Sequence, residues 1–142
     1  MIEPTGADTL RSAQELARAL ARRLGVPTRH LQIGEVATHD GGAHLEVDAD
    51  GTLHRVVTER GQELSRRTTD DVDELLYWVF EAATFGVACD WEVRHRVEGE
   101  DVRIGIFRHQ FDLLDQLDPT WTDRRRRELG PILDELGRDR LS

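Results

Sequence analysis

Residues 57–80, VTERGQELSRRTTDDVDELLYWVF, decide the fold class of this chain. Within them, Arg60-Gly61 signals a tight turn, and residues 62–69 after it favour a strand. Asp70-Asp71 indicates a helix start, because carboxylates there accept backbone N–H groups that have no partner inside the helix. The apolar block of residues 75–80 gives that helix a large surface to bury. A strand that leads into a buried helix predicts a protein of mixed α and β structure.

Elements before this unit complete the first half of the expected fold. Apolar side chains recur at three- and four-residue steps over residues 7–24, which predicts a helix with Thr5 and Asp8 as its capping pair. We expect a short edge strand at residues 30–36. A three-stranded antiparallel meander is then predicted at residues 43–48, 52–59 and 62–69.

Helices are expected in the rest of the chain. The helix that opens at Asp70-Asp71 is expected to end or kink at Phe85-Gly86, and a further helical segment is expected at residues 90–97. Two more helices are predicted at residues 101–117 and 119–136. The sequence therefore predicts an α+β fold with an N-terminal helix, a small antiparallel β-meander, and three to four C-terminal helices packed on the sheet. We expect one domain over residues 1–142.

Composition predicts a well-solvated protein. The hydrophobic fraction of 38% lies below the usual range of about 45–50%, and the charged fraction of 33% lies above the usual ~25%. Cys89 is the only cysteine, so no disulfide can form within the chain. Residues 1–10 contain Glu3, Pro4 and Asp8 and no apolar run, so we expect no signal peptide. No stretch approaches the ~20 apolar residues of a membrane helix, and we expect a soluble, cytoplasmic protein.

Charge is unevenly distributed along the sequence. The net charge is −9, and all 19 basic residues are arginine. Residues 38–101 hold 16 acidic residues against 6 arginines, whereas the two flanks are nearly balanced. An acidic middle argues against nucleic acid as a partner, because phosphates require a basic surface. It suits a basic protein partner, since opposite potentials speed encounter. A surface that only keeps the protein in solution is the alternative.

His39, His44 and His54 are the residues most suggestive of a metal site. His39 and His44 flank Asp40, and His54 falls on the expected neighbouring strand. A metal needs three or four converging ligands, and this spacing matches no recognised ligand pattern. We therefore predict exposed histidines, no bound metal and no cofactor. A small metal-dependent enzyme, or an accessory subunit of one, that uses this cluster is the alternative.

Three other features have both a structural and a functional interpretation. Residues 48–51, DADG, resemble the start of a calcium loop but lack its distal Glu, so a hairpin turn explains them better. Cys89 follows an apolar segment, where a buried thiol is more usual than a nucleophile. Four arginines at residues 124–127 lie between Asp123 and Glu128, which favours a solvated helix face with ion pairs over a contact with RNA.

Charges of alternating sign surround Gly99. They form either an ion-pair network between two helical segments or a polar patch that faces a partner. The residues concerned are Arg94, Arg96, Glu98, Glu100, Asp101 and Arg103.

The order of several short segments resembles a known family. They span about half of the chain: VTERG at 57–61, DVDELLYWVF at 71–80, Thr84-Phe85, RVEGED at 96–101, Phe107 with Gln110, Leu113-Leu114, and DPTW at 118–121. In these residues the chain resembles the bacterial polymorphic-toxin immunity proteins of the Immunity protein 63 family.

This resemblance implies a cytoplasmic inhibitor, made beside a secreted toxin, that binds the toxin domain and protects the producing cell. It implies a cognate protein toxin as partner, which the acidic middle suggests is basic, and it implies no catalysis. The acidic middle and the lack of a long apolar stretch predict that neither nucleic acid nor a membrane is a partner. We expect the contacts to come from polar residues of the second hairpin and the following helix start. They are Glu59, Arg60, Gln62, Glu63, Asp70, Asp71, Asp73 and Glu74. Asp70 and Asp71 could instead only cap the helix, and Arg60 could only hold the turn. A regulatory or scaffold module with an unrelated partner is a further alternative.

Overall fold

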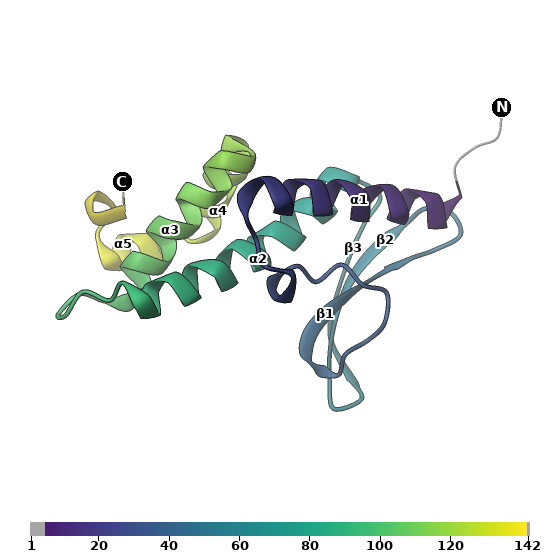
Figure 1. The fold of residues 1–142 in the computed structure, drawn as a ribbon, viewed down its shortest axis with the longest axis horizontal. Helices are drawn as coiled ribbons and strands as arrows, with labels where there is room; N and C mark the ends of the chain where they lie inside the picture. Colours follow the sequence, from purple (N-terminus) through teal and green to yellow (C-terminus); the bar gives the residue numbers. More distant parts are fainter. Residues whose placement is uncertain (1–4, 142) are drawn as a thin grey trace. The chain divides into compact units, whose positions relative to one another are not determined.

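The computed structural model describes residues 5–141 of the chain, and Figure 1 labels the α-helices and strands among the chain's elements. In chain order these are α1 (Gly6–Leu24), the 3-10 turn η1 (Thr28–His30), β1 (Asp40–Val47), β2 (Leu53–Glu59), β3 (Gln62–Thr69), α2 (Val72–Arg94), α3 (Val102–Leu117), α4 (Pro119–Glu128), α5 (Gly130–Leu136) and the 3-10 turn η2 (Arg138–Leu141). The predicted α+β fold is confirmed. Residues 1–4, which belong to the segment from which we expected no signal peptide, lie outside the described part.

The chain divides into two compact units, and the division falls inside α2. The first unit extends to Val79, and the second begins at Phe80. The single domain expected over residues 1–142 stays a prediction. Within the described residues, no helix combines the length and the apolar character that crossing a membrane requires.

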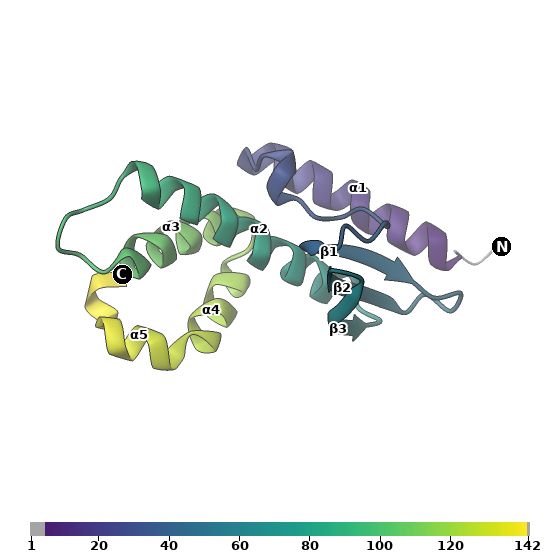
Figure 2. The same cartoon turned by 90° about the horizontal axis from the view of Figure 1, so that it is seen from below.

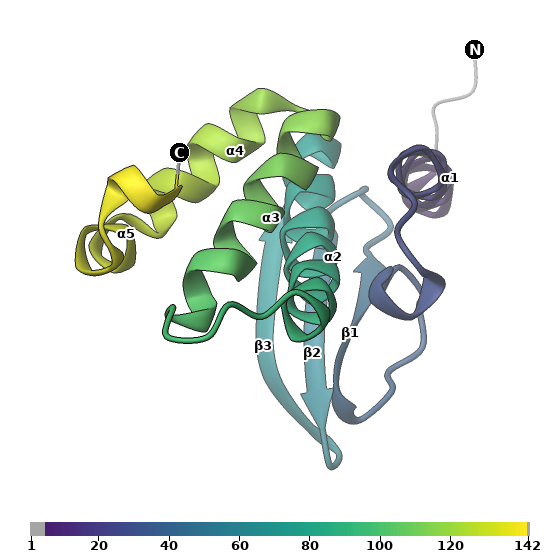
Figure 3. The same ribbon diagram turned by 60° about the vertical axis from the view of Figure 1, so that its left-hand side comes forward.

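In the first unit, α1 lies on the β1 side of the sheet (Figures 2 and 3). Its start is held by the predicted capping box: the Asp8 N–H donates to Thr5 Oγ1 at 3.1 Å, and the Thr5 N–H donates to Asp8 Oδ2 at 3.2 Å. A Cβ at Gly6 would lie 2.1 Å from the Asp48 carbonyl oxygen, so only glycine fits where the helix meets the β1–β2 turn. The apolar stripe buries Leu10 but leaves Leu16 half exposed.

The three strands pair antiparallel in the order β1-β2-β3. Leu45 on β1 and Leu53 on β2 are fully buried, whereas β3 is exposed along nearly its whole length at the sheet edge. Arg60 (φ 51°) and Gly61 (φ 79°) both occupy the left-handed region in the β2–β3 turn. Positive φ at both central residues is the requirement of the two-residue hairpin turn that matches strand twist.

The prediction of an edge strand at residues 30–36 is wrong. This segment follows η1 as irregular chain beside β1, where the Leu45 N–H donates to the Gly34 carbonyl at 2.8 Å. Side chains make the neighbouring bonds: the Gln14 amide donates to the Ile33 carbonyl at 2.7 Å, and the Ala43 N–H donates to the Gln32 side-chain oxygen at 3.2 Å. These side-chain bonds take the place of a regular strand ladder.

Two helix boundaries also differ from those predicted. The α2 helix does not end at Phe85-Gly86 but continues to Arg94. A glycine inside a helix costs only about 1 kcal/mol relative to alanine, and the complete burial of Ala88 beyond it offsets that cost. The helix expected over residues 119–136 is interrupted at Leu129, because Pro131 has no N–H to donate to the preceding turn.

The second unit has its own apolar core, which α3 shares with α4, α5 and η2. The buried members are Ile104, Phe107, Phe111, Leu129, Leu133, Leu136 and Leu141. The ring of Phe80 on α2 stacks on that of Trp121 on α4, with centroids 6.1 Å apart. This contact holds α4 against the part of α2 that belongs to the second unit, from Phe80 onward.

Candidate functional site

The hairpin residues predicted as contacts lie at the tip of the β2–β3 turn. Glu59, Arg60 and Gln62 are exposed there, and the Arg60 N–H donates to the His39 carbonyl at 3.0 Å. Arg60 therefore holds the turn through its backbone while its side chain points outward from an exposed position.

Glu63 is exposed but already has a partner. Arg66 donates to Glu63 Oε1 at 2.7 Å and to Glu46 Oε1 at 3.0 Å, so one guanidinium joins two carboxylates across the sheet. Hydrogen bonds from Arg66 lower the pKa of both carboxyl groups, and the two glutamates raise the pKa of Arg66. Part of the predicted negative charge is thus neutralised within the sheet.

The acidic residues predicted at the helix start lie at the other end of β3. Asp71 Oδ1 accepts from the Asp73 N–H at 2.9 Å, which makes Asp71 the cap of α2. Asp70 and Asp73 are exposed, and Glu74 is partly buried. The eight residues of β3 are separated by seven steps of ~3.4 Å, so the strand places this group roughly 24 Å from the hairpin tip. The structure therefore places the eight predicted contacts in two patches.

Two of the three histidines differ from the prediction in their burial, whereas His39 is exposed as predicted. His44 and His54 are buried, not exposed, and each binds a side chain nearby. His44 Nε2 lies 2.7 Å from Glu46 Oε2, and His54 lies 2.8 Å from the Thr68 hydroxyl and 3.0 Å from Asp48 Oδ2. Residues 5–141 contain no group of three or more His, Cys, Asp or Glu side chains that could hold a metal ion.

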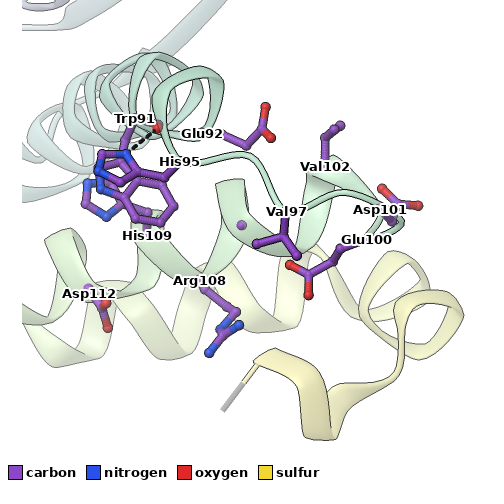
Figure 4. A pocket seen from close by; sticks show the side chains of 11 residues that line it. Trp91, Glu92, His95, Val97, Glu100, Asp101, Val102, Arg108, His109 and Asp112 are labelled. Carbon is purple, nitrogen blue, oxygen red and sulfur yellow. Dashed lines mark hydrogen bonds between the residues drawn. The ribbon is translucent and has the colours of Figure 1, made fainter.

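A hollow of about 230 Å³ opens in the second unit, between the end of α2, the loop that follows it and the start of α3 (Figure 4). We call it the α2–α3 hollow. Its lining residues are Trp91, Glu92, His95, Val97, Glu100, Asp101, Val102, Gly105, Arg108, His109 and Asp112.

One wall of the α2–α3 hollow is a stack of three rings, visible in Figure 4. The Trp91 indole lies between His95, at 4.4 Å between centroids, and His109, at 4.5 Å. His95 Nδ1 lies 2.8 Å from the Trp91 carbonyl oxygen, which can only accept, so Nδ1 carries the proton. Burial lowers the pKa of His109, and His95 adds to this effect while Asp112 opposes it. The wall is therefore aromatic, and His109 is held toward its neutral form.

Ion pairs lie at the end of α2 and at the start of α3. Arg96 forms two hydrogen bonds, of 2.8 and 3.1 Å, with the buried carboxylate of Glu92. Asp101 caps α3 by accepting from the Arg103 N–H at 3.0 Å, and its pairing with the Arg103 guanidinium at 2.8 Å lowers the pKa of Asp101 to about 2. The alternating charges around Gly99 thus include two ion pairs and also line a concave surface.

Sequence reasoning missed this hollow. The Trp91–His95 pair has the four-residue spacing that brings side chains together on a helix, and this is a signal that could have been noticed. His109 belongs to another helix, and no local spacing reports its approach to Trp91. The run at residues 124–127 does form ion pairs as predicted: Arg124 binds Glu128, and Arg125 binds Glu81 at 2.9 Å.

Comparison with known proteins identifies one family. No curated protein and no solved structure matches the chain. The family model described as Immunity protein 63 matches residues 49–130, which is more than half of the chain and includes the α2–α3 hollow. The chain therefore belongs to the Immunity protein 63 family.

Proposed function

We propose that this chain is an immunity protein that binds a cognate bacterial toxin domain and neutralises it by occlusion. The family match over residues 49–130 is the observation that carries the proposal. Such a protein acts without catalysis, in the cytoplasm of the cell that makes the toxin. Its affinity comes from a few well-packed anchor residues inside a larger complementary surface.

Charge supports a basic toxin as the partner. The chain has a net charge of −9, and its acidic residues are concentrated between residues 38 and 101. Opposite potentials accelerate association and disfavour wrong partners. The two patches on the first unit, at the hairpin tip and at the start of α2, contribute contacts to this toxin in our proposal.

Co-expression in cells tests the proposal. The toxin domain encoded beside this gene is induced in a sensitive host, with or without this chain. We expect the chain to restore growth. An immunity protein that is specific for a different toxin should leave this toxin active. Growth arrest that continues although the chain is folded and abundant would contradict the proposed function.

A paired variant tests the helix-start patch. Asp70→Arg with Asp73→Arg reverses two exposed charges and leaves the Asp71 cap in place. We expect weaker protection from the double variant, because like charges then face a basic toxin. Glu15→Arg, which reverses the charge of an exposed residue on α1 outside the family match, serves as the control. Full protection by the double variant would remove this patch from the interface.

A further inference from the structure

We propose that the α2–α3 hollow receives a single arginine side chain of the toxin. This inference rests on the proposed function. It identifies a toxin arginine as an anchor residue through which the chain binds the toxin. Protein interfaces concentrate their binding energy in a few residues that fill pockets, and arginine is among the residue types enriched at such positions.

The size of the hollow suits one large side chain. Its volume of about 230 Å³ exceeds the ~150 Å³ of an apolar cavity that holds benzene. It is smaller than the ~300–1,000 Å³ of pockets that take drug-sized ligands. The volume therefore suits a single large side chain that enters from a partner.

The charges in the hollow favour a cation. Four carboxylates line it, against the single guanidinium of Arg108. Glu92 and Asp101 already bind Arg96 and Arg103. The carboxylates of Glu100 and Asp112 form no hydrogen bond or ion pair within the described part of the chain. Two acidic groups thus remain for a ligand, and Arg108 is the group that opposes a cation.

The ring stack favours a planar cation with several donors. Both faces of Trp91 are covered, so a ligand can stack only on the outer face of an imidazole or meet the indole edge. Because His95 Nδ1 carries the proton, the Nε2 atom of the neutral ring is an acceptor. A guanidinium is planar, stacks on aromatic rings and has five N–H donors, whereas an ammonium is a compact point charge. The hollow therefore fits arginine better than lysine.

The rim of the hollow is apolar. Val97 is 58% exposed and Val102 is 40% exposed, and both line the opening. Two exposed valines beside a charged hollow suit the methylene stem of an arginine, which buries along apolar surface while its head binds polar groups.

Filling the hollow is the most direct test. A Cβ at Gly105 would lie 3.5 Å from Glu92 Cγ and 3.8 Å from Trp91 Cζ3, which are ordinary contact distances. Gly105→Leu would place its remaining atoms in the hollow, and Gly105→Ala is a milder second variant. Both residues have higher helix propensity than glycine, so α3 is retained, and thermal unfolding verifies this.

Affinity for the purified, inactivated toxin domain is measured by calorimetry. We expect Gly105→Leu to raise the Kd by about thirtyfold or more, which is the threshold of an interface hot spot converted at tenfold per 1.4 kcal/mol. If the wild-type chain binds and folded Gly105→Leu binds equally well, this inference is wrong and the proposed function stands. If the wild-type chain does not bind, the proposed function itself fails.

Charge variants determine the sign of the occupant. We expect Asp112→Asn to raise the Kd and Arg108→Gln to lower it, each by about two- to fivefold, as for exposed charge pairs. Asp115→Asn, one turn away on α3 and outside the lining, is the matched control. A lower Kd for Asp112→Asn together with a higher Kd for Arg108→Gln would show that the occupant is anionic, and would overturn the proposal.

A double-mutant cycle identifies the arginine. Each surface arginine of the toxin is changed to alanine and tested against wild-type chain and Asp112→Asn. We expect one toxin arginine whose effect is strongly non-additive with Asp112→Asn, because residues in contact are coupled and distant ones are not. Additivity for every toxin arginine would overturn the assignment.

Discussion

His109 lines the α2–α3 hollow, and its burial lowers its pKa. Its ring meets Trp91 of α2, with His95 behind that indole, while Asp112 acts on it from the next turn of α3. Arg108 and the loop residue Glu100 are the other charged groups lining the hollow for which residues 5–141 supply no ion pair. Burial keeps the imidazole of the folded state neutral where the unfolded state would take up a proton.

Stability should therefore fall as the pH drops below the ordinary histidine pKa. The contribution of His109 is complete above about pH 6.5 and is lost below it, because the unfolded state then binds more protons. We expect His109→Gln to lose less stability than the wild type between about pH 7.5 and about pH 5. Urea unfolding at the two pH values measures both losses, and equal losses would show that His109 does not titrate with folding.

Arg60 is the residue whose structural and binding roles can be separated. It occupies the left-handed region, which costs a residue with a Cβ about 1–2 kcal/mol, and asparagine tolerates that region better. We expect Arg60→Asn to raise the free energy of unfolding by up to about 1 kcal/mol. The affinity of the same variant for the toxin domain then measures how much the Arg60 side chain alone contributes to binding. A loss of stability would contradict the turn geometry.

At the scale of elements, Gln110 connects three helices of the second unit. It is fully buried on α3, and its amide donates to the Glu81 carbonyl at 3.0 Å and to the Thr84 hydroxyl at 3.2 Å, both on α2. Its oxygen accepts from Arg125 Nε of α4 at 3.2 Å. Thr84 and Gln110 therefore belong to one buried network between α2 and α3.

Gln110→Leu should therefore destabilise the protein. The change removes the acceptor of Arg125 Nε on α4 and the donor shared by the Glu81 carbonyl and the Thr84 hydroxyl on α2. Losing such hydrogen bonds inside a protein costs about 1–3 kcal/mol. Gln116→Ala on the exposed side of the same helix is the control, and we expect it to stay within about 0.5 kcal/mol. Chemical unfolding measures both variants. Similar values for the two would mean that the network adds nothing to the stability.

Local chemistry predicted most element boundaries. The Thr5–Asp8 capping box, the Arg60-Gly61 turn and the Asp118-Pro119 helix start all formed where their residues indicated. The errors arose where tertiary contacts or a single proline decided the outcome. Gly86 did not break α2, because burial on both sides of it outweighs a small backbone penalty. Pro131 did break the last helix, and its effect was overlooked in an otherwise regular apolar pattern.

At the scale of the whole molecule, the sequence indicated the chemistry of a binding protein but not its concave site. The sequence alone shows that acidic residues cluster near the hairpin and the helix start. The structure shows that these two groups lie at opposite ends of β3. The hollow combines Trp91 with His109, which are far apart in the chain. Such a juxtaposition depends on how α2 and α3 pack, and no periodicity within either helix encodes it.

Occlusion without turnover is the central claim, and stoichiometry tests it most directly. The active toxin domain is held at a fixed concentration well above the Kd, and purified chain is added in steps while toxin activity is recorded. The account predicts that activity falls linearly and ends at a fixed molar ratio, because each bound chain blocks one toxin. Complete inactivation by a small fraction of that amount, increasing with time, would show catalysis and contradict the account.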